Sequence, residues 1–295
     1  MRQANAVFVF NRGYIGQFKV TFFSLTENNP KLSWTAHILY HGLTGEDKED
    51  IARFIAGRGA QSRFYEIDDS IFDGLPKMTY DTAHTAYYKV LVPYLLQEKG
   101  VYLFFDCDMI VKGDVSALLD LPETAFLSAV RDGMIEKNHK DHVERVTGSR
   151  GGIYFNSGFM RLDLSATGQI APQEDVMAYL AGNARLIRWH DQDVLNHFYA
   201  AGCRVLPEKY NYLTTYRSLS DLFLRRGSRK AVVVHYANWK PWKNNYIGKC
   251  YGLYRKYYRK CLGEKGVDFL QRRSLPAQIG LIVKYVMRAF RKGDL

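Results

Sequence analysis

The first half of the chain alternates short apolar runs with stretches of helical periodicity. The β-rich runs, which predict β-strands, span residues 6–10, 36–41, 63–68 and 101–105, of which 101–105 is apolar at every position, with further strand-like runs at 125–130, 153–163 and 231–235. The helical stretches span residues 16–27, 44–57 and 82–98; a Thr44–Asp47 capping box opens the second, and Pro93 is expected to kink the third. Uniformly apolar strands separated by helices are typical of a parallel sheet covered on both faces, so we expect an α/β fold.

Polar residues follow two of the predicted strands. In VYLFFDCDMIV (residues 101–111), Asp106 and Asp108 come directly after an apolar run, and Asn11 follows the strand AVFVF. Ligands of open α/β sheets bind beyond the carboxyl ends of the strands. We therefore expect the ligand site at this edge, although the chain contains neither GxxxxGK[ST] nor GxGxxG.

Asp106 and Asp108 are one residue apart, and two carboxylates this close repel each other unless a positive charge lies between them. Residues i and i+2 at a strand end point the same way, so both carboxylates can converge on one hard cation. Such a cation relieves the repulsion and can bridge to diphosphate oxygens as a Lewis acid. The metal-free alternative is that Asp106 caps the next turn while Asp108 is solvated.

Three more motifs follow this segment. They are YFNSGFMRLDL (154–164), HDQDVLNHFY (190–199) and VVVHYANWKPW (232–242). With AVFVFNRGY and TAYYKVLVP before them, they resemble the motifs of the retaining glycosyltransferases of family 8, in particular the bacterial lipooligosaccharide galactosyl- and glucosyltransferases. The resemblance covers residues from about 6 to 242. It implies a GT-A-type, Rossmann-like nucleotide-binding fold with a mostly parallel central sheet, forming a catalytic domain at 1–245.

The resemblance implies that Asp106, Asp108 and His235 ligate a divalent ion, manganese or else magnesium. Two carboxylates and an imidazole suit manganese better than calcium. Lys240 would neutralise the diphosphate of a UDP-sugar as a point charge. Without the KPW that follows it, His235 would be read as a histidine with its own hydrogen-bond partner at a strand end.

The same resemblance assigns residues to the donor. Asn11 and Tyr14 would lie at the nucleotide, Lys89 at the sugar nucleotide, and Asn156 and Ser157 at the donor sugar. Two of these residues depart from the family pattern. Asn11 stands where the family usually has an aspartate that accepts a hydrogen bond from uracil, and Lys89 stands where it usually has an arginine. A third departure is Asn238, in place of a glycine near the phosphates.

The reacting part of the donor is implied to face Asp191, Gln192 and Asp132. Asp191 would hold sugar hydroxyls, and Gln192 would lie beneath the anomeric carbon opposite the leaving group; Asp132 is alternatively a loop aspartate. Asp193 is expected to cap the helix that follows it. Gln192 is an amide and a poor nucleophile, so the family interpretation is front-face attack through an oxocarbenium-like ion pair, with the departing diphosphate taking the acceptor proton.

The net charge of +11 is concentrated at the C-terminal end. Residues 240–295 hold 14 Lys and Arg against three Asp and Glu, so the rest of the chain is neutral. YGLYRKYYRK (251–260) interleaves tyrosines with cations, and residues 279–290 place an apolar stripe opposite cations at helical spacing. We expect residues 246–295 to be a basic, aromatic, amphipathic tail that associates with anionic membranes. The alternative is a stripe that packs on the domain; nucleic acid is disfavoured because the body is neutral.

The predicted function is a metal-dependent retaining hexosyltransferase. It would transfer galactose or glucose from a UDP-sugar to a lipid-linked or lipopolysaccharide-type saccharide. The alternatives are a nucleotide-sugar hydrolase, a transferase for a soluble or protein-linked acceptor, and a non-catalytic sugar-nucleotide or membrane-binding protein. Four cysteines without a CxxC pair, and an N-terminus without an apolar leader, favour a reduced cytoplasmic protein at the inner membrane face, unless a leader has been removed.

Overall fold

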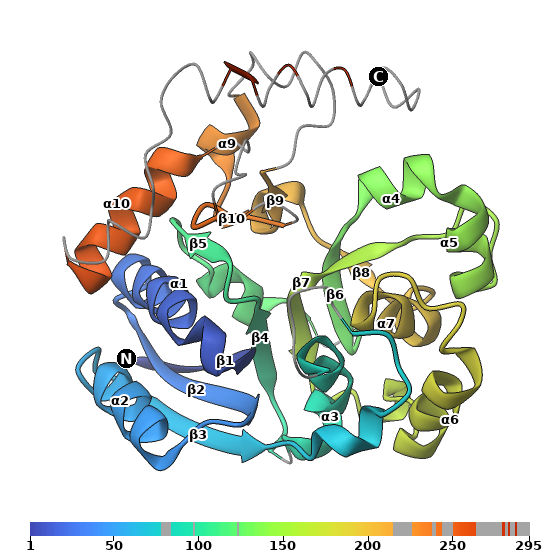
Figure 1. Cartoon of the computed structure of the whole chain (residues 1–295), viewed down its shortest axis with the longest axis horizontal. Helices are drawn as coiled ribbons and strands as arrows, with labels where there is room; N and C mark the ends of the chain where they lie inside the picture. Colours follow the sequence, from blue (N-terminus) through green and yellow to red (C-terminus); the bar gives the residue numbers. More distant parts are fainter. Residues whose placement is uncertain are drawn as a thin grey trace.

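A seven-stranded sheet runs through the centre of the computed structural model in the order β3-β2-β1-β4-β7-β6-β8 (Figure 1). Its strands are β1 (Arg2–Asn11), β2 (Leu32–His41), β3 (Gln61–Glu66), β4 (Val101–Phe105), β6 (Leu127–Arg131), β7 (Phe155–Asp163) and β8 (Arg204–Val205). The structure describes residues 1–77, 84–96, 98–122, 124–214, 226–237, 240–243 and 250–263, together with 279, 280, 283 and 287.

Most neighbouring strands of this sheet run parallel. β3, β2, β1 and β4 are successively parallel, and β8 is parallel to β6. The reversed strand is β7, which is antiparallel to both β4 and β6. The prediction of an α/β fold with a mostly parallel central sheet is therefore confirmed.

Helices cover both faces of the sheet, which explains why residues 6–10 of β1 and 102–105 of β4 are buried without interruption. On one face, Phe8 and Phe10 of β1 pack with residues of α1 (Ile15–Asn28) and α2 (Gly45–Ala56). On the other face, Val7 and Val9 pack with residues of η3 (Thr85–Leu91), α3 (Val92–Leu95), α6 (Gln173–Asn183) and α7 (Asp191–Tyr199). The predicted Thr44–Asp47 capping box is present at the start of α2.

The helix expected at 82–98 differs most from its prediction. Residues 85–91 form a 3₁₀ helix, η3, and only Val92–Leu95 is α-helical; residues 82, 83 and 97 lie outside the described residues. Pro93 has no N–H to donate to the carbonyl of Lys89, so this carbonyl accepts from Val92 N–H, three residues on, instead. Pro93 therefore lies at the start of a short helix and does not kink a long one.

A second sheet places a late segment of the chain beside an early one. It contains β5 (Met109–Val111), β10 (Val233–His235) and β9 (Tyr212–Leu213), in the order β5-β10-β9. β10 is antiparallel to β5, with His235 opposite Met109. The strand predicted at 231–235 thus lies next to the segment that follows the two aspartates, outside the main sheet.

The remaining helices are shorter and lie around the two sheets. The α-helices are α4 (Gly133–Asn138), α5 (Lys140–Thr147), α9 (Arg226–Lys230) and α10 (Tyr251–Leu262). The other 3₁₀ helices are η1 (Arg12–Tyr14), η2 (Asp69–Phe72), η4 (Ser116–Asp120), η5 (Thr167–Gln169) and η6 (Glu208–Tyr210). Within the described ranges, none of the helices has both the length and the apolar composition needed to cross a bilayer.

The aromatic segment 251–260 forms α10, which packs beside α1 (Figure 1). Tyr254, Tyr257 and Tyr258 are buried in a cluster with Val20 and Trp242. The Asn28 amide also donates to the Tyr257 hydroxyl at 2.8 Å. These three tyrosines are therefore contacts of the folded body, whereas Lys256, Arg259 and Lys260 of the same helix are exposed.

Candidate active site

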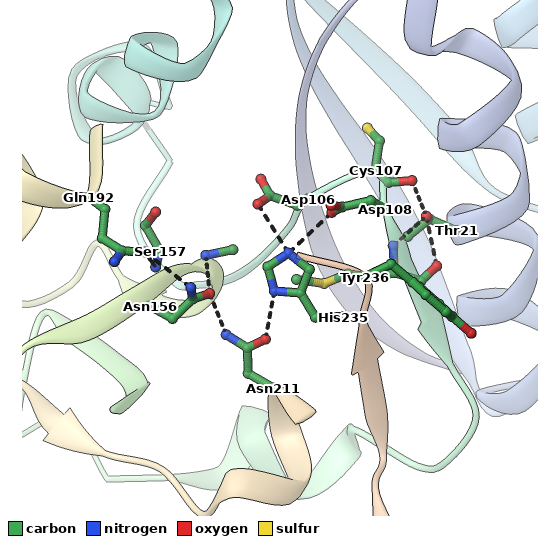
Figure 2. Close-up of polar contacts among 12 residues, drawn as sticks. Thr21, Asp106, Cys107, Asp108, Asn156, Ser157, Gln192, Asn211, His235 and Tyr236 are labelled. Carbon is green, nitrogen blue, oxygen red and sulfur yellow. Dashed lines mark hydrogen bonds and ion pairs between the residues drawn. The ribbon is translucent and has the colours of Figure 1, made fainter. Parts of the chain in front are cut away.

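Asp106 and Asp108 extend from the end of β4 toward His235 on β10 (Figure 2). Their ligand atoms all lie within 4.8 Å of one another. The Nε2 atom of His235 is 3.3 Å from Asp108 Oδ1 and 3.8 Å from Asp106 Oδ2. Cys107, between the two aspartates, is buried in the core. The predicted three-residue cluster is therefore assembled, and Asp108 is buried and not solvated.

This donor set fits a divalent cation. Asp108 Oδ1 is buried, yet it makes no hydrogen bond within the described part of the chain. A buried carboxylate oxygen without a hydrogen bond is costly, and a cation between it and His235 Nε2, 3.3 Å away, would compensate for the missing bond. Two carboxylates and one imidazole leave coordination positions open for phosphate oxygens.

The backbone of the acidic segment is held on both sides. The Thr21 hydroxyl of α1 bridges the carbonyls of Cys107 and Met109, at 2.8 and 2.9 Å (Figure 2). Tyr236 N–H donates to the carbonyl of Asp108 at 2.9 Å, and Asp106 N–H donates to that of Gly158 at 2.8 Å. These bonds fix the acidic segment against α1, β7 and β10 at once.

Two lysines neutralise the carboxylates. Lys240 forms an ion pair with Asp108, and Lys89 Nζ lies 2.9 Å from Asp106 Oδ1 and 3.1 Å from Asp191 Oδ2. Burial raises the pKa of Asp108, but the charges of Lys240 and His235 outweigh burial and hold it well below its usual range. Burial raises the pKa of Asp106 above its ordinary value, although Lys89 opposes this. The two carboxylates therefore differ in proton affinity.

Lys89 links the metal cluster to the sugar side. Its ammonium is buried, which lowers its pKa, but the carboxylates of Asp106 and Asp191 outweigh burial and raise the pKa above the ordinary lysine value. The ammonium therefore stays charged between the two aspartates. Sequence reasoning expected only a weakened replacement for arginine at this position; the structure shows a cation that contacts both halves of the site.

Asn211 was not identified from the sequence. It lies just before β9, and its amide nitrogen donates to Asn156 Oδ1 at 2.8 Å, which turns its oxygen toward His235 Nδ1 at 2.9 Å. The Asn211 oxygen can only accept, so His235 donates from Nδ1, and Nε2 is the ring nitrogen that faces the two aspartates. An isolated asparagine in a loop carries no spacing signal; only the folded chain brings it to a histidine 24 residues later.

The predicted sugar-side residues converge in one buried network. Asn156 Nδ2 donates to Asp132 Oδ2 and to Gln192 Oε1, both at 3.1 Å. Ser157 N–H donates to the same Gln192 oxygen at 3.1 Å, and its hydroxyl donates to Asp191 Oδ2 at 2.7 Å. Through Asn156 and Asn211 this network is continuous with His235, so metal site and sugar site form one polar system.

The loop before Gln192 is strained. His190 has φ 49° and ψ −124°, a rare conformation for a residue with a side chain, and α7 begins at the next residue. Asp193 was expected to cap this helix, and that prediction is wrong, because the N-cap of α7 is His190. The buried Asp193 carboxylate instead accepts from the backbone N–H groups of Arg188 and Trp189, at 2.7 and 3.1 Å, and so holds this loop.

Gly158 leaves room for the metal ligands. A Cβ at this position would lie 2.3 Å from His235 Cε1 and 2.8 Å from Asp106 Oδ2, closer than any side chain tolerates. Its backbone N–H donates to Asn156 Oδ1 at 3.0 Å. The packing of His235 and Asp106 therefore excludes a side chain at this position.

The predicted nucleotide residues lie at the end of β1 and in η1. Asn11 Oδ1 accepts from Gly13 N–H at 3.0 Å, and Asn11 Nδ2 donates to the Thr85 hydroxyl at 3.5 Å. The Tyr14 ring packs edge-on against Trp242, two residues after Lys240, with centroids 6.1 Å apart. These hydrogen bonds hold the Asn11 amide at the end of β1, beside η1. Asn238 lies outside the described residues.

Comparison with known proteins places this geometry in a family. Residues 5–246 match the family model described as "Glycosyl transferase family 8". The chain is 25% identical over 236 residues to a lipopolysaccharide 1,2-glucosyltransferase of Escherichia coli, covering 76% of this chain and 70% of that protein. It is 24% identical over 244 residues to a lipopolysaccharide 1,3-galactosyltransferase of Salmonella typhimurium, covering 81% and 72%.

Among solved structures, the fold is similar to that of the galactosyltransferase LgtC in complex with donor and acceptor sugar analogues. The TM-score is 0.75 at 18% identity, over 90% of this chain and all of that one. The glycosyltransferase GlyE of Streptococcus pneumoniae TIGR4 gives a TM-score of 0.65 at 18% identity, over 92% of this chain and 66% of that one. These likenesses confirm the GT-A-type architecture.

Proposed function

The chain belongs to glycosyl transferase family 8 and is a retaining hexosyltransferase, and we propose that it transfers galactose or glucose from a UDP-sugar to a lipid-linked, lipopolysaccharide-type saccharide. One observation carries the proposal. The Asp106–Asp108–His235 cluster, suited to a metal and a diphosphate, is joined by hydrogen bonds to the buried network of Asn156 and Gln192. The relatives whose names specify lipopolysaccharide glucosyl and galactosyl transfer support the choice of sugar and acceptor.

The residues around the cluster would bind and neutralise the donor. A manganese or magnesium ion held by Asp106, Asp108 and His235 would supply Lewis-acid stabilisation of the departing diphosphate. Lys240, which pairs with Asp108 in this structure, would share its ammonium with the diphosphate. Asn11 and Tyr14 would bind the nucleotide, and the amide oxygen of Asn11 is a hydrogen-bond acceptor of the kind that pairs with the uracil N–H.

Transfer would retain configuration at the anomeric carbon. The bond from that carbon to the diphosphate oxygen breaks, and its electron pair leaves with UDP. The acceptor hydroxyl oxygen bonds to the same face, and its proton passes to the departing diphosphate oxygen. The hydrogen bonds of Asp132 and Asp191 to their neighbours position both carboxylates for sugar hydroxyls.

The sugar side does not favour a covalent intermediate. A double displacement needs a free carboxylate beneath the anomeric carbon. Asp191 is paired with Lys89 and accepts from Ser157, and Gln192 Oε1 accepts from two N–H groups. Gln192 would instead place its fixed amide dipole against the positive charge that develops on the sugar ring.

We also propose that the enzyme works at the cytoplasmic face of a membrane. Ile279, Val283 and Met287 are helical, four residues apart, and 54%, 49% and 53% exposed. Residues at this spacing lie on one helix face, so these three form an exposed apolar row. Cations near a membrane surface each contribute about 1 kcal/mol toward anionic lipid. The other stripe residues predicted in 279–290 lie outside the described residues.

The test is a donor screen. Purified full-length protein is incubated with UDP-galactose, UDP-glucose and other UDP-sugars, with and without Mn²⁺, and with and without lipid-linked glycan, while UDP release is measured. We expect release with one of the two hexoses that needs both metal and acceptor. Equal release without acceptor would identify a hydrolase, and no release with any donor would identify a non-catalytic binding protein; either result contradicts the proposal.

A further inference from the structure

A hollow of about 480 Å³ is lined by residues of α4, α5 and the loop before α7, and none of them belongs to the metal cluster. We call it the basic hollow. Its cationic lining residues are Lys137, Lys140, Arg145 and Arg188, and Asp141 is its one carboxylate. Figure 1 shows α4 and α5 on one side of β6 and β7, with the β5-β10-β9 sheet on the other. The hollow is therefore separate from the residues assigned to the diphosphate.

The four cations of the basic hollow have no ion-pair partner in the described ranges. By contrast, Arg131, nearby on β6, is paired with Glu136 at 2.9 Å. Four positive charges around one space, with a single carboxylate among them, repel one another. The body outside residues 240–295 is electrically neutral, so this grouping is a local separation of charge. An anion is the ligand that would relieve it.

Hydrogen bonds connect the lining of the basic hollow to the segment that carries the sugar-site residues. Its buried residue His142 bonds through Nε2 to Asp193 Oδ1 at 2.9 Å, and Asp193 holds the loop that leads to Asp191. Asp132, bonded to Asn156, also caps α4, whose far end opens into the hollow. At 1.5 Å per residue, the six residues of α4 span about 9 Å. A saccharide of two or more rings is long enough to span this length.

We propose that the basic hollow binds an anionic group, a phosphate ester, carried by the acceptor saccharide. This rests on the proposed function, because it assumes that a saccharide acceptor occupies the sugar site. The volume holds more than a single phosphate, which favours a phosphate attached to a sugar. Lysine and arginine side chains from two helices and a loop would bind the several charged oxygens of a phosphate ester more strongly than they would bind a neutral sugar hydroxyl.

Direct binding tests the proposal without requiring turnover. Trehalose 6-phosphate, trehalose and inorganic phosphate are titrated separately into the full-length protein by calorimetry. We expect saturable, salt-sensitive binding of trehalose 6-phosphate, weaker binding of inorganic phosphate, and none of trehalose. Loss of three charge-assisted contacts in Lys137→Ser/Lys140→Ser/Arg145→Ser should weaken binding by about tenfold or more.

A matched control removes the same charge elsewhere. Lys31, Arg53 and Lys99 are exposed cations outside the hollow, and the triple serine variant at these positions should bind trehalose 6-phosphate unchanged. Thermal melting checks that each variant is folded. If the hollow variant melts early, the single variants Lys140→Ser and Arg145→Ser replace it.

Three results would overturn the proposal. They are no binding of the sugar phosphate, equal loss in the hollow and control variants, and inorganic phosphate binding as tightly as the sugar phosphate. Displacement of trehalose 6-phosphate by mixed phosphatidylcholine–phosphatidylglycerol vesicles would identify the hollow as a membrane contact. That result would also contradict the proposal. Failure of the UDP-sugar screen would refute the proposed function but would not change these binding results.

Discussion

Asn211 and Asn156 fix the direction of the hydrogen bonds that run from the metal cluster to the sugar-side residues. The Asn211 oxygen accepts from His235, and its amide nitrogen donates to Asn156. The Asn156 nitrogen donates in turn to Asp132 and Gln192, so a single arrangement of hydrogens satisfies this series of hydrogen bonds. Such partners of a metal-binding histidine fix its tautomer and ring orientation. At the residue scale, the metal site therefore depends on a side chain that touches neither metal nor sugar.

We expect Asn211→Ala to weaken metal binding by about 10–100-fold, because His235 loses the acceptor that orients its ring. The measurement is Mn²⁺ affinity in the presence of UDP, with the melting temperature as a check on folding. Asn211→Asp should not restore affinity fully, because a carboxylate cannot donate to Asn156 Oδ1.

The matched control is Asn183→Ala, which removes an amide that bonds Tyr179 on α6, away from the site. Its Mn²⁺ affinity should equal that of the unsubstituted protein. Equal affinity in Asn211→Ala would show that Asn211 has no positioning role.

Gly158→Ala should disrupt the cluster directly. The new Cβ would overlap His235 and approach Asp106, and overpacking of this kind costs about 1–3 kcal/mol. We expect both a lower melting temperature and loss of Mn²⁺ binding. Gly168→Ala, where a Cβ meets nothing within 4 Å, should change neither; a Gly158→Ala protein that binds Mn²⁺ normally would refute the steric argument.

At the scale of elements, the sequence pattern predicted the strands better than the connections. The continuous apolar run of β1 and the capping box of α2 are local properties, so they could be predicted from the sequence alone. The 3₁₀ helix η3 could not, because its backbone bonds depend on Pro93 and on packing against the sheet. The strand at His235 was predicted, but its partner β5 is set by tertiary contacts more than 100 residues away.

The packing of α10 gives a prediction at this scale. Tyr254 is fully buried, so Tyr254→Ala should destabilise the body by about 3–5 kcal/mol, measured by denaturant unfolding. Its hydroxyl has no hydrogen-bond partner within the described residues, so Tyr254→Phe should be neutral or slightly stabilising. A small effect of Tyr254→Ala would mean that α10 does not pack as described.

For the whole molecule, the candidate site could be predicted residue by residue only through the family resemblance. Spacing alone indicated the pair Asp106 and Asp108, and the structure brings His235, Lys240 and the sugar-side residues to them. Lys89 was expected as a weak substitute, and Asn211 was missed. Both act through contacts that join distant segments, for which a single sequence carries no periodic signal.

The charge distribution of the chain gives a prediction at the same scale. A chain that ends at Gly263 keeps α10 but loses the last part of the basic segment, so it should bind vesicles containing phosphatidylglycerol at least about tenfold more weakly. Cosedimentation measures this. Its release of UDP from a UDP-sugar with a soluble saccharide acceptor should be retained, and undiminished vesicle binding would contradict the membrane proposal.

The central claim is that Asp106, Asp108 and His235 together hold one divalent ion. Titration of Mn²⁺ into the full-length protein with UDP, followed by electron paramagnetic resonance, counts bound ions directly. We predict one bound equivalent, lost in His235→Ala and in Asp106→Ala at an unchanged melting temperature. Full Mn²⁺ binding by both variants would contradict the claim.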